Sequence, residues 1–230
     1  MNRCLWCKEE IAYTYTFFEL FIYDKGKSPI CDFCCSKLET LKDTTHCLGC
    51  GRKQESTSLC SDCLEWKKLY PNEPFKHMAL FTYNSFAKEY MEKFKIMGDC
   101  ELAGLFSQDL KLAVKQFGKE AVIVPIPISQ RSQQERGFNQ IELLLQKARI
   151  SYIPLLKNNS KQEKQSKKDK RERMLTSQPF EVEDTYAEKI TDKAIVIIDD
   201  IYTTGRTVFH AADSIRPYKP SKIVTLSLFR

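Results

Sequence analysis

Two adjacent carboxylates, Asp199 and Asp200, precede a short loop that is rich in hydroxyl groups. The loop contains one glycine and leads into an apolar-patterned segment; its members are Thr203, Thr204, Gly205, Arg206 and Thr207. Adjacent carboxylates are costly to bury unless they meet hydroxyls, cations or water, and they suit the cis-diol of a ribose with its Mg²⁺. Glycine can adopt a positive φ, and the free N–H groups at the start of a helix favour an anion. The run therefore predicts a sugar-phosphate site.

Eight cysteines form a second group that can do chemistry, because they occur as four Cys-x-x-Cys pairs: Cys4, Cys7, Cys31, Cys34, Cys47, Cys50, Cys60 and Cys63. This spacing lets one tight turn supply two tetrahedral ligands, so the cysteines predict two structural Zn²⁺ sites. Pairing in chain order is one arrangement and an interleaved pairing is the other. Cys35 can substitute for its neighbour in the first site. Redox-active dithiols are the competing interpretation, which four regular pairs disfavour.

The composition is that of a globular protein. The chain has 230 residues, of which 42% are hydrophobic, enough to bury a core. No apolar run approaches the roughly 20 residues that a membrane-spanning helix needs, and no signal-peptide pattern follows Met1. We therefore expect a soluble, cytoplasmic protein. The formal charge is +6, and residues 157–173 hold eight basic against three acidic side chains.

An apolar strand must position the two carboxylates. Residues 193–198 are almost continuously apolar, which predicts a buried strand that delivers Asp199 and Asp200 to its carboxyl end, where open α/β sheets bind ligands. Residues 207–215 have the pattern of a helix. The other predicted strands are residues 79–83, 121–128 and 222–229, and the other predicted helices are residues 85–97, 102–117 and 139–148. Ser85 is the expected cap of the first of these helices and Gly98 its end.

Alternating strands and helices predict an α/β domain with a mostly parallel sheet. Residues 70–74 contain two prolines and no helical pattern, so they mark the expected boundary. We expect a double zinc-ribbon module over residues 1–68 and the larger domain over residues 75–230. The module is too small to bury much of a core without metal.

Residues 196–208 resemble the phosphoribosyl-diphosphate motif of type I phosphoribosyltransferases. The resemblance implies that Asp199 and Asp200 are the catalytic carboxylates that hold the ribose hydroxyls, with Mg²⁺, and that the following loop wraps the 5′-phosphate. It also implies that residues 125–129 contact pyrophosphate. We expect an arginine to contact the pyrophosphate as well, because a planar guanidinium suits phosphate oxygens, and we favour Arg136 over Arg131. A surface ion pair with Glu135 or Glu142 is the competing interpretation.

Further blocks resemble the ComF family of competence-associated proteins: residues 94–99 (FKIMGD), 124–127 (VPIP), 134–140 (QERGFNQ), 165–166 (QS) and 172–173 (ER). Together with the amino-terminal cysteine module, the resemblance extends over nearly the whole chain. Residues 174–176 depart from the basic and Asn residues that many relatives carry. The resemblance implies a role in natural transformation, with single-stranded DNA and the uptake helicase as partners, in the cytoplasm or peripherally at the inner face of the membrane.

Two questions stay open at this point. The basic run at residues 157–173 corresponds to the mobile loop that closes over the site in this fold, but a solvated surface and a track for DNA phosphates are equally compatible with its composition. The chain is either a binder of phosphoribosyl diphosphate and single-stranded DNA or an active phosphoribosyltransferase on an unidentified acceptor. A regulator that only senses the sugar phosphate is a third class, because one fold hosts enzymes and non-enzymes.

Overall fold

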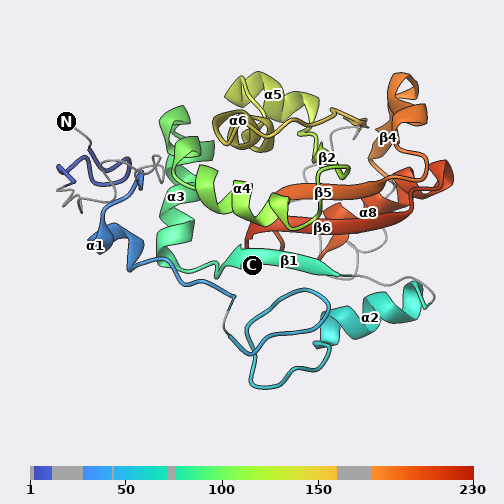
Figure 1. Cartoon of the computed structure of the whole chain (residues 1–230), viewed down its shortest axis with the longest axis horizontal. Coiled ribbons are helices and arrows are strands. Elements are labelled where there is room, and N and C mark those ends of the chain that lie inside the picture. Colours follow the sequence, from blue (N-terminus) through green and yellow to red (C-terminus); the bar gives the residue numbers. More distant parts are fainter. Residues whose placement is uncertain (1–2, 12–27, 43, 72–75, 160–177) are drawn as a thin grey trace.

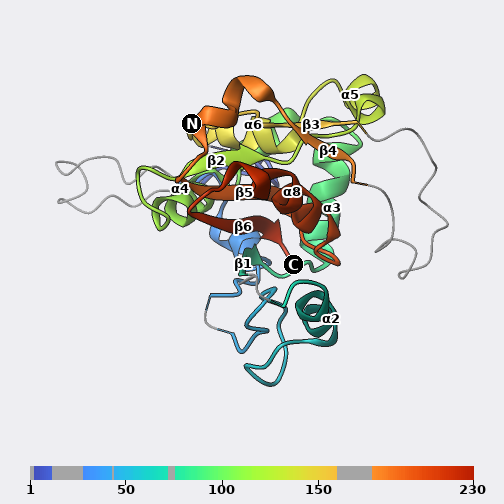
Figure 2. The ribbon, with the colours of Figure 1, turned by 90° about the vertical axis from the view of Figure 1, so that its right-hand side faces the viewer.

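The main sheet has four strands in the order β1-β6-β5-β2 (Figures 1 and 2). The computed structural model describes residues 3–11, 28–42, 44–71, 76–159 and 178–230. All pairings in this sheet are parallel, which confirms the expected α/β class. Its strands are β1 (His77–Phe81), β2 (Val122–Pro125), β5 (Ala194–Ile201) and β6 (Lys222–Phe229).

The strand β5 is buried on both faces, as its continuous apolar sequence predicts. Ile195 and Ile197 pack with the helix α8 (Arg206–Ile215) in one core cluster. Val196 and Ile198 point the other way, into a larger cluster. Because neighbouring strands cover both edges of β5 as well, its carboxyl end has a fixed position in the sheet.

The larger cluster joins the sheet to a layer of helices. These are α3 (Ser85–Lys95), the 3₁₀ helix η1 (Cys100–Gly104), α4 (Ser107–Lys115) and α6 (Gln140–Lys147). The helix α5 (Gln130–Arg136) lies between β2 and α6 in the chain.

Two details of this layer differ from expectation. Asn84, not Ser85, caps α3, since its side chain accepts a hydrogen bond from the Ala87 N–H at 3.1 Å. The helix expected over residues 102–117 is divided into η1 and α4. At the division, Phe106 has φ −103° and ψ 11° and is fully buried against Tyr90, so ring packing outweighs helix continuity.

A two-stranded antiparallel sheet lies with α8 on the opposite face of the main sheet. Its strands are β3 (Leu156–Asn158) and β4 (Phe180–Val182), and both contribute to the cluster that contains Ile195. Two further 3₁₀ helices are η3 (Asp184–Lys189), which follows β4, and η4 (Arg216–Tyr218), which follows α8. Tyr186 of η3 and Tyr218 of η4 pack against the same cluster. The basic run expected at residues 157–173 lies outside the described residues except for its first three positions. Within the described residues, no helix combines the length and apolarity needed to cross a membrane.

The cysteine-rich segments pack on two different parts of the larger domain. The segment with α1 (Asp32–Cys35) lies beside α3, where Trp6 packs on Phe86 with ring centroids 4.4 Å apart (Figure 1). The segment with α2 (Ser61–Leu69) lies beyond the β1 edge of the sheet (Figure 2). There the His77 N–H donates to the Gly49 carbonyl at 2.9 Å. Residues 72–74 of the expected domain boundary lie outside the described residues.

Candidate functional site

The acid pair stands near the carboxyl end of β5. Asp199 and Asp200 are each half-buried, and the Asp200 N–H donates to Asp199 Oδ1 at 2.9 Å. Burial raises the pKa of Asp199 to about 7, and the charge of Asp200 acts in the same direction. Asp199 is therefore close to its titration point at neutral pH, ready to lose its proton when a cation or a set of hydroxyls approaches.

Lys95 is a member of this site that the sequence interpretation missed. It is the last residue of α3, and its Nζ lies 2.6 Å from Asp200 Oδ2. The two side chains are 21% and 13% exposed, so the pair is partly shielded from solvent. Lys95 also lowers the pKa of Asp199, against the effects of burial and Asp200. The only sequence signal for this residue was its place in the block at residues 94–99.

The loop after the acid pair turns sharply at Gly205 into α8. Gly205 has φ +86°, and a Cβ there would lie 2.1 Å from Tyr202 Oη, so no other residue fits without rearrangement. Within the described residues, no side-chain hydrogen bond caps α8. Its first N–H groups are therefore available to an anion beside Thr203 and Thr204.

Arg206 begins α8 with its guanidinium held along the helix. Its Nε donates to His210 Nε2 at 3.0 Å. Burial lowers the pKa of both side chains, and the Arg206 charge lowers that of His210 further. Arg206 Nη1 is buried and has no hydrogen-bond partner in the described part of the chain. A phosphate oxygen would satisfy this donor.

The loop after β2 is held by two asparagines. Asn139 Nδ2 donates to the Ile126 carbonyl at 3.0 Å, and Asn158 Nδ2 donates to the Pro127 carbonyl at 3.1 Å. A hollow of about 600 Å³ opens beside this loop, between α5, α6 and β3. These two hydrogen bonds hold the loop in one shape.

The two arginines near that loop behave differently. Arg131 Nε lies 2.6 Å from Glu135 Oε1 on the surface of α5, and both side chains are 54% exposed. Arg131 therefore forms a surface ion pair, as the competing interpretation expected. Arg136 is the half-buried last residue of α5. Its contact with pyrophosphate stays a prediction.

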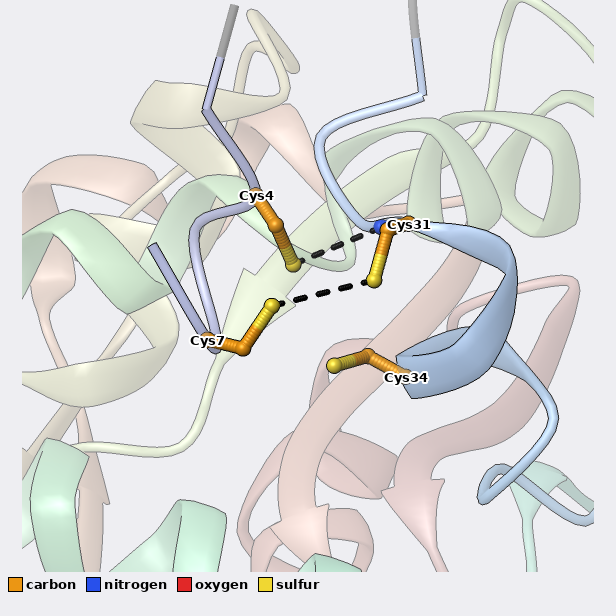
Figure 3. Close-up of side chains that lie close together, drawn as sticks. All are labelled: Cys4, Cys7, Cys31 and Cys34. Atoms are coloured by element: carbon orange, nitrogen blue, oxygen red, sulfur yellow. Dashed lines mark hydrogen bonds between the residues drawn. The ribbon is translucent and has the colours of Figure 1, made fainter. Parts of the chain in front are cut away.

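The cysteines gather in two groups of four in chain order. The sulfurs of Cys4, Cys7, Cys31 and Cys34 point toward one another, and all lie within 4.8 Å (Figure 3). The same holds for Cys47, Cys50, Cys60 and Cys63. The Cys7 and Cys31 sulfurs are 3.8 Å apart, and the Cys50 and Cys60 sulfurs 3.6 Å. These distances match the edge of a ZnS₄ tetrahedron, about 3.8 Å for Zn–S bonds of 2.3 Å. Cys35 is exposed and belongs to neither group.

One thiol in each group is poised to ionise. A hydrogen bond from Cys63, together with Arg230, lowers the pKa of Cys50 to about 4 despite burial. Burial raises the pKa of Cys4, but backbone N–H groups, first that of Cys7, outweigh it and lower the value to about 6. Burial raises the pKa of Cys34, and the hydrogen bond with Cys50 raises that of Cys63, so each group mixes thiols that ionise readily with thiols that resist ionisation. A divalent metal bound among the four sulfurs of a group would stabilise all of them as thiolates.

Comparisons with known proteins find a family model that matches the C-terminal part of the chain and relatives that match most of its length. The model of the phosphoribosyl transferase domain matches residues 136–230, which contain the acid pair and its loop. Competence protein ComFC of Bacillus subtilis is 37% identical over 215 residues, covering 91% of this chain and 86% of that protein. Competence protein ComFC of Streptococcus pneumoniae is 32% identical over 228 residues, covering 99% and 100%. Competence protein F of Haemophilus influenzae is 24% identical over 220 residues, covering 89% and 92%.

Proposed function

This chain belongs to the ComFC family of competence proteins, and on that premise we propose that it binds phosphoribosyl diphosphate with Mg²⁺ at residues 199–207 during DNA uptake. One observation carries the proposal. A half-buried acid pair at the end of a central parallel strand is followed directly by a glycine-dependent loop and an uncapped helix start. A ribose with a 5′-phosphate matches that order of groups.

Each part of the ligand has its own partner in this proposal. Asp199 and Asp200 accept hydrogen bonds from the ribose hydroxyls, and the loop at residues 203–207 donates backbone N–H groups to the 5′-phosphate. The loop after β2, with Arg136, faces the pyrophosphate. Mg²⁺ would supply charge neutralisation on the pyrophosphate, and the carboxylates fit it because hard cations prefer oxygen ligands. Lys95 is the protein's own cation at the acid pair when no ligand is bound.

Thermal unfolding tests this binding without an assumption about catalysis. A ligand that binds only the folded state raises the midpoint in proportion to the logarithm of its concentration above its Kd. We expect phosphoribosyl diphosphate with Mg²⁺ to raise the midpoint, and ribose without phosphates to leave it unchanged. An equal shift from pyrophosphate alone would show that the ribose contacts contribute nothing and would contradict the assignment of the acid pair.

Transfer chemistry is the second candidate function, favoured by the match to a phosphoribosyl transferase domain. An acceptor nucleophile would form a bond to C1 of the ribose, while the bond from C1 to the pyrophosphate oxygen breaks and pyrophosphate departs. Electrostatic stabilisation of that leaving group is the main catalytic demand. Pyrophosphate release with candidate acceptors tests this function; equal rates in the wild type and in Asp199→Ala/Asp200→Ala would refute it.

Single-stranded DNA is the proposed macromolecular partner. The basic run at residues 157–173 and the membership of a competence family motivate this partner. Phosphate contacts release counterions, so affinity for an oligothymidine should fall steeply between two salt concentrations. Competition between the oligonucleotide and phosphoribosyl diphosphate would show that the basic run serves both ligands, whereas salt-independent binding would exclude a phosphate track.

The biological setting in this proposal is the cytoplasm, beside the uptake helicase that receives imported single strands. The test is complementation of a strain that lacks its ComFC gene. Wild-type protein should restore transformation, and Asp199→Asn/Asp200→Asn protein present at equal abundance should not. Full restoration by the variant would separate the sugar-phosphate site from DNA uptake.

A further inference from the structure

The second cysteine group contacts the phosphate loop through a tryptophan. Trp66 lies on α2, one helical turn after the ligand Cys63, and is 6% exposed. Its indole Nε1 donates to the Thr204 carbonyl at 2.6 Å, across 138 residues of sequence. This partly buried hydrogen bond directly connects the helix that carries Cys63 to the loop that follows the acid pair.

Aromatic packing holds the donor in place. The Trp66 ring stacks on Phe209, with centroids 4.0 Å apart and planes 15° from parallel. Phe209 belongs to the first turn of α8, the helix whose N-terminus follows the loop. Tyr70 extends the stack to Phe209 and donates from its Oη to Asp213 Oδ2 at 2.5 Å. The indole therefore cannot turn without disturbing both helices.

A second bridge joins the same cysteine group to the start of the loop. Arg230 Nη2 donates to Cys50 Sγ at 3.3 Å, and its Nη1 donates to the Tyr202 carbonyl at 3.3 Å. Tyr202 is the residue whose hydroxyl leaves no room for a Cβ at Gly205. The positions on both sides of Thr203 are thus tied to the second cysteine group.

The bond to Thr204 has a geometric consequence. In a trans peptide the C=O and the next N–H lie in one plane and point in opposite directions. Because Trp66 holds the Thr204 carbonyl, the Gly205 N–H points away from Trp66. An N–H directed in this way is one of the donors that a phosphate in the loop would use.

We propose that Trp66, on the helix that carries Cys63, is a positioning residue for the phosphate loop and strengthens the loop's affinity for a phosphate. The first cysteine group serves another element, since Trp6 packs on Phe86 of α3 and lies under Lys93 Nζ, 4.2 Å from the ring centroid. This inference rests on the proposed binding of phosphoribosyl diphosphate. It adds that the two cysteine groups have different consequences for that binding.

Trp66→Phe is the direct test, because phenylalanine keeps an aromatic ring and loses the donor. Trp6→Phe is the matched control at the first cysteine group. Calorimetric titration with phosphoribosyl diphosphate and Mg²⁺ should give an affinity about three- to tenfold weaker for Trp66→Phe, as expected for one hydrogen bond, and an unchanged affinity for Trp6→Phe. Both variants should keep the wild-type metal content. Wild-type affinity in Trp66→Phe would overturn the inference.

Fluorescence supplies a readout that a purely structural role would not move. The chain has two tryptophans, so Trp6→Phe leaves Trp66 as the only one. Saturating phosphoribosyl diphosphate should shift its emission, with the midpoint at the calorimetric Kd. Binding heat without any emission change would overturn the inference and leave the proposed function standing, even if Trp66→Phe fails to fold. Absence of binding heat in the wild type would overturn the proposed function and the inference with it.

Discussion

Lys95 Nζ lies 2.6 Å from Asp200 Oδ2, so α3 supplies a cation to the acid pair at the end of β5. Without that contact, two adjacent half-buried carboxylates would repel each other in a region of reduced solvation. The ion pair explains how the site persists in the absence of a ligand. It also means that a bound cation or a ribose must compete with, or join, an existing partner of Asp200.

Removing Lys95 should destabilise the protein and favour divalent cations at the acid pair. Loss of one partner leaves a partly buried charge unpaired, so Lys95→Met should lower the free energy of unfolding by about 1 to 3 kcal/mol. Mg²⁺ should recover part of the loss. Urea unfolding with and without Mg²⁺ measures both effects. Lys88→Met, at an exposed position of the same helix, is the control; equal behaviour of the two variants would contradict the role of Lys95.

The raised pKa of Asp199 makes the stability of the protein depend on pH. An unfolded carboxyl titrates near 3.9, whereas the folded Asp199 titrates near 7, so between these values the folded state binds an extra proton. This contribution to stability is complete below the unfolded pKa and is lost as the pH rises through 7. Asparagine does not titrate. Asp199→Asn should therefore gain stability relative to the wild type, by up to about 4 kcal/mol between pH 4 and pH 8.

Chemical denaturation at the two pH values, with Mg²⁺ removed, measures this difference. A constant difference between Asp199→Asn and the wild type would show that Asp199 titrates normally in the folded protein. The same titration predicts weaker binding of phosphoribosyl diphosphate at pH 6 than at pH 8, because Asp199 must be ionised to accept hydroxyl hydrogen bonds alongside a cation.

Glycine at position 205 should be required for space as well as for backbone conformation. Gly205→Ala introduces a Cβ 2.1 Å from Tyr202 Oη at φ +86°. Gly118→Ala has a similar φ, +88°, and nothing within 4 Å of the new Cβ. Both substitutions carry the cost of a left-handed backbone, roughly 1 kcal/mol, and Gly205→Ala adds the clash. Circular dichroism melts should show the larger loss in Gly205→Ala, with phosphoribosyl-diphosphate binding abolished in that variant alone. Equal melts would contradict the tight packing under the loop.

Two metal ions per chain are expected, one in each cysteine group. Cys31→Ser and Cys60→Ser should each reduce the zinc content from two equivalents to one and lower the melting temperature, because a structural metal contributes folding free energy. Cys35→Ser should retain both ions, since Cys35 is exposed and outside the groups. Atomic emission on the purified proteins gives the count. A content of one ion in the wild type would contradict the assignment of two closed sites.

The local parts of this account could be predicted from the sequence. The strand, the acid pair, the glycine loop and the helix follow one another without interruption, so pattern and turn chemistry reveal them together. The close spacing of the Cys-x-x-Cys pairs made chain-order grouping one of two natural expectations. The cap of α3 was placed one residue away because Asn84 and Ser85 are both good caps, and only the fold selects between them.

The contacts that connect distant segments could not be predicted in this way. Lys95 joins Asp200, and Trp66 joins Thr204, only because helices dock on particular edges of the sheet. The break before α4 depends likewise on the burial of Phe106 against rings from other elements. Only at the break before α4 does tertiary packing override a local propensity; the other two contacts depend on how distant segments meet.

Calorimetric titration of the wild-type protein with phosphoribosyl diphosphate and Mg²⁺, beside Asp199→Asn/Asp200→Asn, tests the central claim most directly. We predict one saturable site per chain in the wild type and an affinity at least about a hundredfold weaker in the variant, because hydrogen bonds to charged groups contribute roughly 1.5 to 3 kcal/mol each. Both proteins should keep two metal ions. Equal affinities for the two proteins, or no binding to the wild type, would contradict the claim that residues 199–207 form a phosphoribosyl-diphosphate site.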